Sequence, residues 1–416
     1  MNIDSSQKRT LSNIIMLYAL TIAKIIFPLL SLPYLTRVLS TDCYGVVSYV
    51  KSYITYVQLI VDFGFILSSV KEIVQAEGDK KEIGVIVGQT FFSKIFLSFL
   101  SLVLTVLMCN NVPILKEYTR YTLLSFIVVF LSSFLADFLF RGIEKMHYIS
   151  IVFVIMKGIS TTLTFFCVKS DSDILWIPLL DIISSIIAIS VTLYIIIFRL
   201  TIKIKVVSVK RSLLMLKDSF FYFISNMATT AFGALNTLMI GILITDLAEV
   251  AYWSVCSSIV AAIQSIYTPI TNGVYPYMIR NKNLKYIHRI LKIVMPVLFL
   301  GATIGFFTSK TVLLIVGGEK YVGAYRLLQC FIPLLLISFP SMLYGWPTLG
   351  AIGKEKETSF TTLIAAGVQT MGLFVLIIFN RFTLINIALL RTVTEFVLFG
   401  QRCFLTYKNR NEFDIV

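Results

Sequence analysis

The strongest constraint on the fold is a series of long apolar stretches that recur along the chain. Hydrophobic residues make up 57% of the sequence and charged residues 14%, and the mean hydropathy is +0.87. A helix needs about 20 mostly apolar residues to cross a bilayer. Twelve stretches meet that need, at 11–37, 44–67, 83–108, 119–140, 147–168, 174–198, 218–245, 249–275, 288–309, 324–350, 358–379 and 383–405. The sequence therefore predicts an all-α integral membrane protein with twelve transmembrane helices.

The longest basic connection between spans divides the chain into two halves of six spans. This connection runs from Arg199 to Lys217. We expect it to separate two lobes, residues 1–205 and residues 206–416. Paired six-helix lobes in a transporter typically place the substrate path at their interface.

The basic residues are unevenly distributed between the two sides of the predicted membrane. Of the 36 Lys and Arg residues, 23 lie in connections on the side of the N-terminus, including Arg402, and 8 lie on the opposite side. The positive-inside rule then places both termini in the cytoplasm. The net charge of +14 is explained by this topology and by attraction to anionic lipid headgroups. It does not indicate nucleic-acid binding.

Five cations fall inside the predicted spans: Lys24, Lys51, Lys94, Lys157 and Arg391. A Lys or Arg at the centre of a spanning helix costs roughly 2.5 to 3.5 kcal/mol, so such residues usually line a polar cavity or pair with an acid. Four of the five lie in the first lobe. We expect a cation-lined cavity there that binds an anion, because phosphate and pyrophosphate are natural ligands for lysine.

An alternative explanation for these cations is pairing or extension toward the membrane surface. Lys24, Lys94 and Lys157 have Asp181 as a candidate partner, and long side chains can also reach toward an interface. For Lys51, about two turns from the outer end of its span, this second explanation is as good as cavity lining.

Three acids inside or beside spans, Asp62, Asp181 and Glu395, are candidates for ion pairing or for binding a coupling ion. Arg391 and Glu395 are four residues apart, so we expect them to pair on one helix face.

The second lobe offers neutral polar groups that can bind sugar hydroxyls or neighbouring helices. We favour the bonds between helices for each residue taken singly. The group consists of Asn226, Thr229, Thr230, Asn236, Gln264 and Asn272.

Signals of catalysis are weak. The two histidines, His147 and His288, are too few for a metal cluster, and the sequence has no phosphate-binding glycine loop. We therefore expect no catalytic residue, no metal and no cofactor. The tenth span carries Pro333, Pro340 and Pro347, which remove backbone donors and kink helices. Such kinks can form moving gates, although membrane helices also tolerate proline without one.

Several segments together resemble bacterial O-antigen and repeat-unit flippases. In the first half these are Leu32–Leu39 followed by Tyr44-Gly45, Asp62–Phe65 followed by Lys71-Glu72, and Phe140–Met146. In the second half they are Asn236–Gly241, Tyr252–Gln264 and Pro269–Tyr277. The sequence departs from the family at Arg141, where glutamine is usual.

The resemblance implies membership of the multidrug, oligosaccharidyl-lipid and polysaccharide exporter superfamily. It implies two six-helix lobes with pseudo-two-fold symmetry in a V-shaped exporter fold. It also implies an undecaprenyl-pyrophosphate-linked oligosaccharide substrate, moved from the cytoplasmic to the periplasmic leaflet of the bacterial inner membrane by alternating access. The expected partners are membrane lipids, a proton or sodium counter-ion, and glycan polymerase and chain-length proteins.

Two other functions remain open from the sequence. A drug or ion antiporter could share the fold, but a transporter of cationic drugs favours an acidic chamber, whereas the first lobe is rich in cations. A membrane-embedded glycan polymerase would carry a long outward loop, and the longest outward loop here, about Lys310 to Gly323, is short.

Overall fold

The computed structural model describes residues 5–206, 208–244 and 246–413, and all regular elements in these ranges are helical. The chain forms two compact units, Met1–Met227 and Ala228–Val416, called the first unit and the second unit below.

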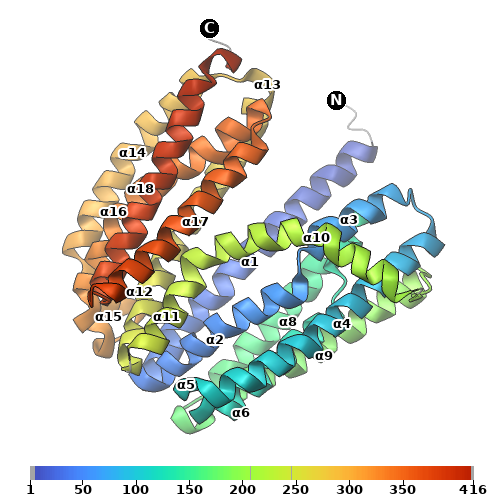
Figure 1. Ribbon diagram of the computed structural model, residues 1–416, viewed down its shortest axis with the longest axis horizontal. Coiled ribbons are helices and arrows are strands. Elements are labelled where there is room, and N and C mark those ends of the chain that lie inside the picture. Colours follow the sequence, from blue (N-terminus) through green and yellow to red (C-terminus); the bar gives the residue numbers. More distant parts are fainter. Residues whose placement is uncertain (1–4, 207, 245, 414–416) are drawn as a thin grey trace. The chain divides into compact units, whose positions relative to one another are not determined.

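The first unit contains ten helices, the last of which continues into the second unit (Figure 1). They are α1 (Ser5–Val38), α2 (Thr41–Asp62), α3 (Phe65–Gln75), α4 (Lys80–Asn111), α5 (Pro113–Glu117), α6 (Thr119–Ser132), α7 (Asp137–Gly142), α8 (Met146–Cys167), α9 (Trp176–Tyr194) and α10 (Val209–Thr230). The α-helices of the second unit are α11 (Asn236–Leu243), α12 (Leu247–Ser265), α13 (Tyr267–Asn281), α14 (Leu284–Phe307), α15 (Ser309–Val316), α16 (Tyr325–Leu343), α17 (Glu355–Ile378) and α18 (Leu384–Lys408).

The number of apolar spans is close to the prediction of twelve. Within the described ranges, ten helical segments are long and apolar enough to cross a membrane, or eleven if the bent pair Tyr222–Ala228 and Gly233–Leu243 is one span. The remaining predicted span, 44–67, corresponds mainly to α2. This helix has 22 residues, but its four tyrosines, Lys51 and two aspartates make it more polar than the others. Eleven of its residues are buried inside the first unit, which reduces its contact with lipid.

Helix boundaries follow local signals in the sequence. Ser40 caps α2 by accepting a hydrogen bond from the backbone of Cys43, and Asp79 caps α4 in the same way. Phe63 and Gly64 take left-handed backbone angles and end α2 before α3 begins. A Cβ atom on Gly64 would lie 2.6 Å from the Cβ of Tyr222, so a side chain has no room there.

The first part of α10 packs on the first unit. The hydroxyls of Ser219 and Ser68 lie 2.6 Å apart, and Arg211 pairs with Glu82 on α4. The sequence placed the lobe boundary between residues 205 and 206, before this helix. The compact first unit extends to Met227 because these contacts hold α10 against α3 and α4.

The connection between α9 and α10 packs directly against α4. The backbone amide of Lys205 donates to the carbonyl of Gly84 at 3.1 Å. A Cβ atom on Gly84 would be 2.1 Å from the carbonyl oxygen of Lys203, and one on Gly88 would be 2.2 Å from that of Lys205. Two glycines one turn apart therefore let an extended backbone lie directly on the helix.

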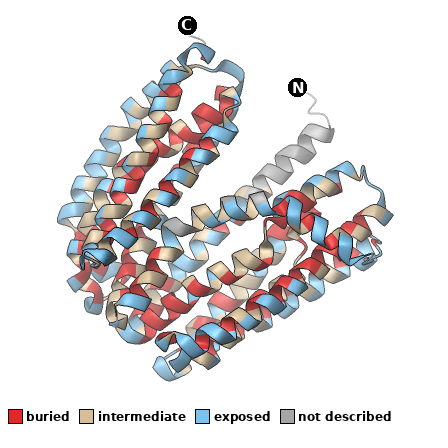
Figure 2. Ribbon diagram, viewed as in Figure 1, coloured by how far each residue is buried: buried red, intermediate tan, exposed pale blue. Residues whose placement is uncertain are grey.

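Each unit buries its own apolar cluster and exposes apolar side chains along outer helix faces (Figure 2). In the first unit the cluster includes Phe138, Leu139 and Phe140 of α7. On α14 the only buried residue is Ile287. Such exposed apolar faces are expected where the surrounding solvent is lipid.

Candidate functional site

The first charged pair of the first unit joins α4 to α2. The Nζ atom of Lys94 lies 2.8 Å from Oδ1 of Asp62. The Lys94 side chain is 9% exposed, whereas that of Asp62 is 44% exposed. The lysine is thus the buried member of the pair, and the aspartate faces open space.

Neutral side chains extend this pair toward α6. Gln58 lies one turn before Asp62 on α2, and its amide donates to Asp62 Oδ2 at 2.8 Å. The hydroxyl of Ser132 donates to Gln58 Oε1 at 3.1 Å. Asp62 therefore links α2 to α4, and Gln58 links α2 to α6.

The second charged pair joins α8 to α9. Lys157 Nζ lies 2.8 Å from Asp181 Oδ1, which also accepts a hydrogen bond from Ser160 at 2.7 Å. The two charged side chains are 33% and 26% exposed. Both pairs agree with the pairing alternative given above, but Lys94 finds Asp62 rather than Asp181.

Lys51 on α2 lies near the second pair without joining it. Its side chain is exposed, and it interacts electrostatically with Lys157 and Asp181. Within the described part of the chain, Lys51 has no ion-pair partner within 4.0 Å. It is a cation close to an already neutralised pair, so it adds net positive charge there.

Lys24 on α1 is the other exposed lysine among the four inside the predicted spans of the first unit. Its Nζ atom lies 5.5 Å from the ring centroid of Phe153, a distance that permits a cation–π interaction. It also interacts electrostatically with Asp137, which lies in the field of Lys94 as well. Among the described residues, Lys24 too has no ion-pair partner within 4.0 Å.

The four lysines inside the predicted spans of the first unit therefore fall into two classes. Lys94 and Lys157 are each held by an aspartate at 2.8 Å, whereas Lys24 and Lys51 are exposed. A bound anion can reach the exposed lysines without first displacing a carboxylate. The arrangement can bind and neutralise a multiply charged anion, and nothing in it resembles a nucleophile paired with a base.

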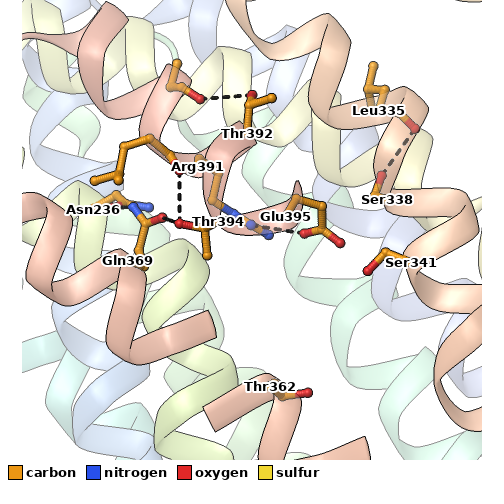
Figure 3. Close-up of polar contacts among 12 residues, drawn as sticks. Asn236, Leu335, Ser338, Ser341, Thr362, Gln369, Arg391, Thr392, Thr394 and Glu395 are labelled. Carbon is orange, nitrogen blue, oxygen red and sulfur yellow. Dashed lines mark hydrogen bonds and ion pairs between the residues drawn. The ribbon is translucent and has the colours of Figure 1, made fainter. Parts of the chain in front are cut away.

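The second unit contains a network of neutral side chains that links three helices. Gln369 of α17 donates to Asn236 of α11 at 2.9 Å and accepts from Thr394 of α18 at 2.8 Å (Figure 3). All three side chains are buried. For Asn236, bonding between helices is confirmed; the side chain of Thr229 lies outside the described residues.

Arg391 and Glu395 form the expected pair on one face of α18, at 3.1 Å (Figure 3). Their side chains are only 13% and 6% exposed. This pair lies within a single helix, so it neutralises two buried charges without joining elements. Whether Arg391 contacts a substrate stays a prediction.

Arg402 corrects the sequence analysis, which counted it among the cytoplasmic connections. It lies inside α18, is 7% exposed, and interacts electrostatically with Glu395. Its guanidinium donates to the carbonyl of Ser341 at 2.8 Å and to the hydroxyl of Thr362 at 3.2 Å. Arg402 lies seven residues after Glu395 and therefore on the same helix face. This spacing in the sequence could have indicated that Arg402 belongs to the helix and not to a connection.

The tenth span is broken where Arg402 meets it. A π-helical turn, η5 (Tyr344–Leu349), follows α16, and Gly345 inside it has non-helical angles. Pro347 cannot donate to the carbonyl of Leu343, and the hydroxyl of Thr348 donates to that carbonyl instead, at 2.8 Å. A Cβ on Gly345 would lie 2.9 Å from the guanidinium of Arg402. The kink predicted from the prolines is present, and side chains satisfy the carbonyls around it.

Comparison with known proteins gives a consistent family. A sequence profile of the polysaccharide biosynthesis protein family matches residues 10–282. A curated relative from Shigella dysenteriae, named for O-antigen transport, is 26% identical over 393 residues, covering 93% of this chain and 98% of the relative. A relative of the same name from Escherichia coli strain K12 is 26% identical over 373 residues, covering 86% and 88%.

Solved structures share the fold at low sequence identity. An inward-facing multidrug resistance MATE family transporter of the MOP superfamily has a TM-score of 0.70 and 12% identity, with 96% of this chain and 99% of that chain covered. The lipid II flippase MurJ, in an inward closed conformation, has a TM-score of 0.68 and 13% identity, covering 95% and 87%. The fold class predicted from the sequence, that of the exporter superfamily, is confirmed.

Proposed function

Because the chain belongs to the polysaccharide biosynthesis protein family, we propose that it is a flippase for lipid-linked oligosaccharides. The substrate is an undecaprenyl-pyrophosphate-linked repeat unit of O-antigen or a related surface polysaccharide. The protein moves it from the cytoplasmic to the periplasmic leaflet of the inner membrane by alternating access, with both termini in the cytoplasm.

One observation carries this proposal: two lysines in the apolar body of the first unit are exposed and have no ion-pair partner among the described residues. Lys24 and Lys51 each leave a positive charge that requires water or an anion. A pyrophosphate linked to a lipid supplies negative charge at membrane depth, which fits this need. The names of the two curated relatives support the same substrate class.

The paired lysines have a different role in this mechanism. Lys94 and Lys157 hold Asp62 and Asp181, so they shape the site and add a positive field around the headgroup. An anion that binds beside them competes with the aspartates for the ammonium groups. Asp62, Asp181 and Glu395 therefore remain the candidates for coupling to a counter-ion, because each carboxylate can change partner.

The test is lipid translocation by purified protein in proteoliposomes. Undecaprenyl-pyrophosphate oligosaccharide is loaded in one leaflet, and its arrival in the other is measured with an impermeant glycosidase. We expect Lys24→Gln/Lys51→Gln to lower the rate at least about tenfold, because an uncompensated headgroup charge is costly in the membrane. Lys24→Arg/Lys51→Arg should retain most of the rate.

The matched control is Lys169→Gln/Lys310→Gln, which removes two exposed lysines that lie over tyrosine rings outside this set. It should transport normally. Normal transport by Lys24→Gln/Lys51→Gln would contradict the proposed site. Absence of lipid movement in the wild type, with drug–proton exchange present, would favour the antiporter. A change in glycan chain length would favour the polymerase.

A further inference from the structure

The longest basic connection of the chain, which joins α9 to α10, has no role in the candidate site. From Arg199 to Lys217 it carries six Lys and Arg residues and no Asp or Glu. One of them, Arg211, pairs with Glu82 of α4. Four others are exposed and, among the described residues, have no ion-pair partner within 4.0 Å; they are called the basic array below and are Arg199, Lys203, Lys205 and Lys210.

The side chains of this connection alternate between a packed face and an open face. Leu200 and Ile202 are buried and belong to the apolar cluster of the first unit. Arg199, Lys203 and Lys205 occupy alternate positions and are exposed. Such alternation is typical of an extended segment that packs one face on a core. The three cations therefore share the open face of the segment.

Backbone contacts hold this open face in a fixed position. The amide of Lys205 donates to the carbonyl of Gly84 at 3.1 Å, and the amide of Ile202 donates to the carbonyl of Ile196 at 3.1 Å. Gly84 and Gly88 leave room for the connection, because a Cβ atom on either glycine would clash with its backbone. The basic array is therefore a preformed surface, and a ligand that binds it does not have to order the chain first.

Exposed apolar and aromatic side chains accompany the array along the chain. Tyr194 and Phe198 precede it, with ring centroids 5.2 Å apart, and Phe198 is 69% exposed. Val206 and Val209 lie between its lysines and are exposed as well. Aromatic side chains at the end of a spanning helix are typical of the membrane interface, the level at which lipid headgroups lie. The array therefore lies at headgroup level, with apolar side chains on either side of it that can enter the bilayer.

We propose that the basic array binds the headgroups of anionic phospholipids in the leaflet beside it. Clusters of about four to eight basic residues next to a spanning helix are typical of binding to anionic lipid. Charge complementarity selects the ligand, because the phosphate of an anionic lipid can neutralise these cations, whereas phosphatidylcholine carries a cation of its own. Bound lipid would also fasten the connection to the first unit. The surface is separate from the proposed transport site and does not depend on the proposed function.

A second basic region, in the second unit, provides a matched control. Lys354, Lys356 and Arg410 belong to the same predicted side of the membrane as the array. Lys354 pairs with Glu412 at 3.1 Å, and the chain neighbours of Lys356 are both glutamates, so this region carries little net charge. Removing three cations there changes the total charge of the protein as much as removing three cations of the array does.

The test is native mass spectrometry of the full-length protein with phosphatidylglycerol and with phosphatidylcholine of identical acyl chains. Each basic residue near the membrane surface contributes roughly fivefold to anionic-lipid affinity. We expect Lys203→Gln/Lys205→Gln/Lys210→Gln to weaken phosphatidylglycerol binding at least about tenfold and to leave phosphatidylcholine binding unchanged. Lys203→Arg/Lys205→Arg/Lys210→Arg should retain binding. Lys354→Gln/Lys356→Gln/Arg410→Gln should change binding less than about twofold. The three lysines of the array are exposed, so gel filtration should show folded protein for the array variants.

Three outcomes would overturn the proposal. Equal binding of phosphatidylglycerol by the glutamine variant of the array and by the wild type would show that the array does not recognise the headgroup. Equal losses in the two glutamine variants would show that total charge alone attracts the lipid. A further arm uses undecaprenyl pyrophosphate as the ligand: if the glutamine variant of the array loses only this ligand, the surface serves the carrier lipid and the phospholipid assignment is wrong.

Discussion

The two units stabilise their polar interiors in different ways. In the first unit, charged pairs link different helices: Lys94 of α4 with Asp62 of α2, and Lys157 of α8 with Asp181 of α9. In the second unit, Gln369 links three helices through neutral hydrogen bonds, and the buried pair of Arg391 and Glu395 lies within α18. A phosphate can compete with the aspartate for the lysine of either pair. Binding of an anion in the first unit can therefore break an ion pair that joins two helices. The neutral network of the second unit has no such competitor.

The largest expected effect follows from the asymmetry of the Lys94 pair. Asp62→Ala leaves a buried ammonium without its counter-ion and should lower stability by about 3 kcal/mol. Lys94→Ala leaves an aspartate that is 44% exposed and can be hydrated, so it should cost about 1 kcal/mol. Thermal unfolding in detergent would measure both. The double variant Asp62→Ala/Lys94→Met should recover most of the stability lost by Asp62→Ala. Equal losses of stability for Asp62→Ala and Lys94→Ala would show that the two members of the pair do not differ in burial cost.

A change at Arg402 should come next, at about 2 kcal/mol. Arg402→Ala leaves the carbonyl of Ser341 and the break in the tenth span without their donor. Gly345→Ala should act in the same direction, because its Cβ would press on the guanidinium. The measurement is again the unfolding midpoint, with Arg410→Ala as the control, since that arginine is exposed. If Arg402→Ala unfolds like the wild type, the broken span does not depend on this cation.

The neutral network should respond less than the charged links. Gln369→Leu leaves Asn236 and Thr394 with one unmade hydrogen bond each and should cost about 1 kcal/mol. The effect should be independent of salt, whereas that of Asp62→Ala should depend on salt. If the stability lost by Gln369→Leu also depends on salt, the contrast between charged links in the first unit and neutral links in the second is wrong.

The smallest effect concerns pH. Burial raises the pKa of the Glu72 carboxyl group, and the nearby Arg211 opposes the rise. The folded state then binds a proton more tightly than the unfolded state, whose value is near 4.5, so stability falls as pH rises through the folded-state pKa. At pH 8, Glu72→Gln should therefore raise the free energy of unfolding by less than about 1 kcal/mol, seen as a slightly higher unfolding temperature than that of the wild type. At pH 4.5 the two proteins should unfold at the same temperature. A gain that is equal at both pH values would exclude a titration effect.

The fold could be predicted from the sequence because its main signal is local. The length of each apolar stretch and the number of basic residues in each connection can be read from one segment at a time. The resemblance to known flippases indicated the superfamily. The second span, α2, is unusually polar, and three of its tyrosines, Tyr44, Tyr49 and Tyr53, are buried inside the first unit. The neighbouring helices that bury these polar residues cannot be identified from the sequence.

The site could be predicted only as a set of residues. The partners of Arg391 and Lys157 were among the alternatives, because few acids lie at the same depth. The pairing of Lys94 with Asp62 and the burial of Arg402 depend on how helices pack, and position within a span does not reveal that. The division of the lysines into paired and exposed classes needed the structure for the same reason.

The close packing of a connection on the two glycines of α4 has a practical consequence for engineering. The connection between α9 and α10 is long and basic, and it would be a natural place to insert a tag or to divide the gene into two co-expressed halves. Its backbone is instead hydrogen-bonded at Gly84 and seated on Gly88, so new termini there would remove that contact. The turn at Gly78 is exposed and has no neighbouring atoms within 4 Å of a built Cβ. Epitope insertion or chain splitting is therefore better tolerated there.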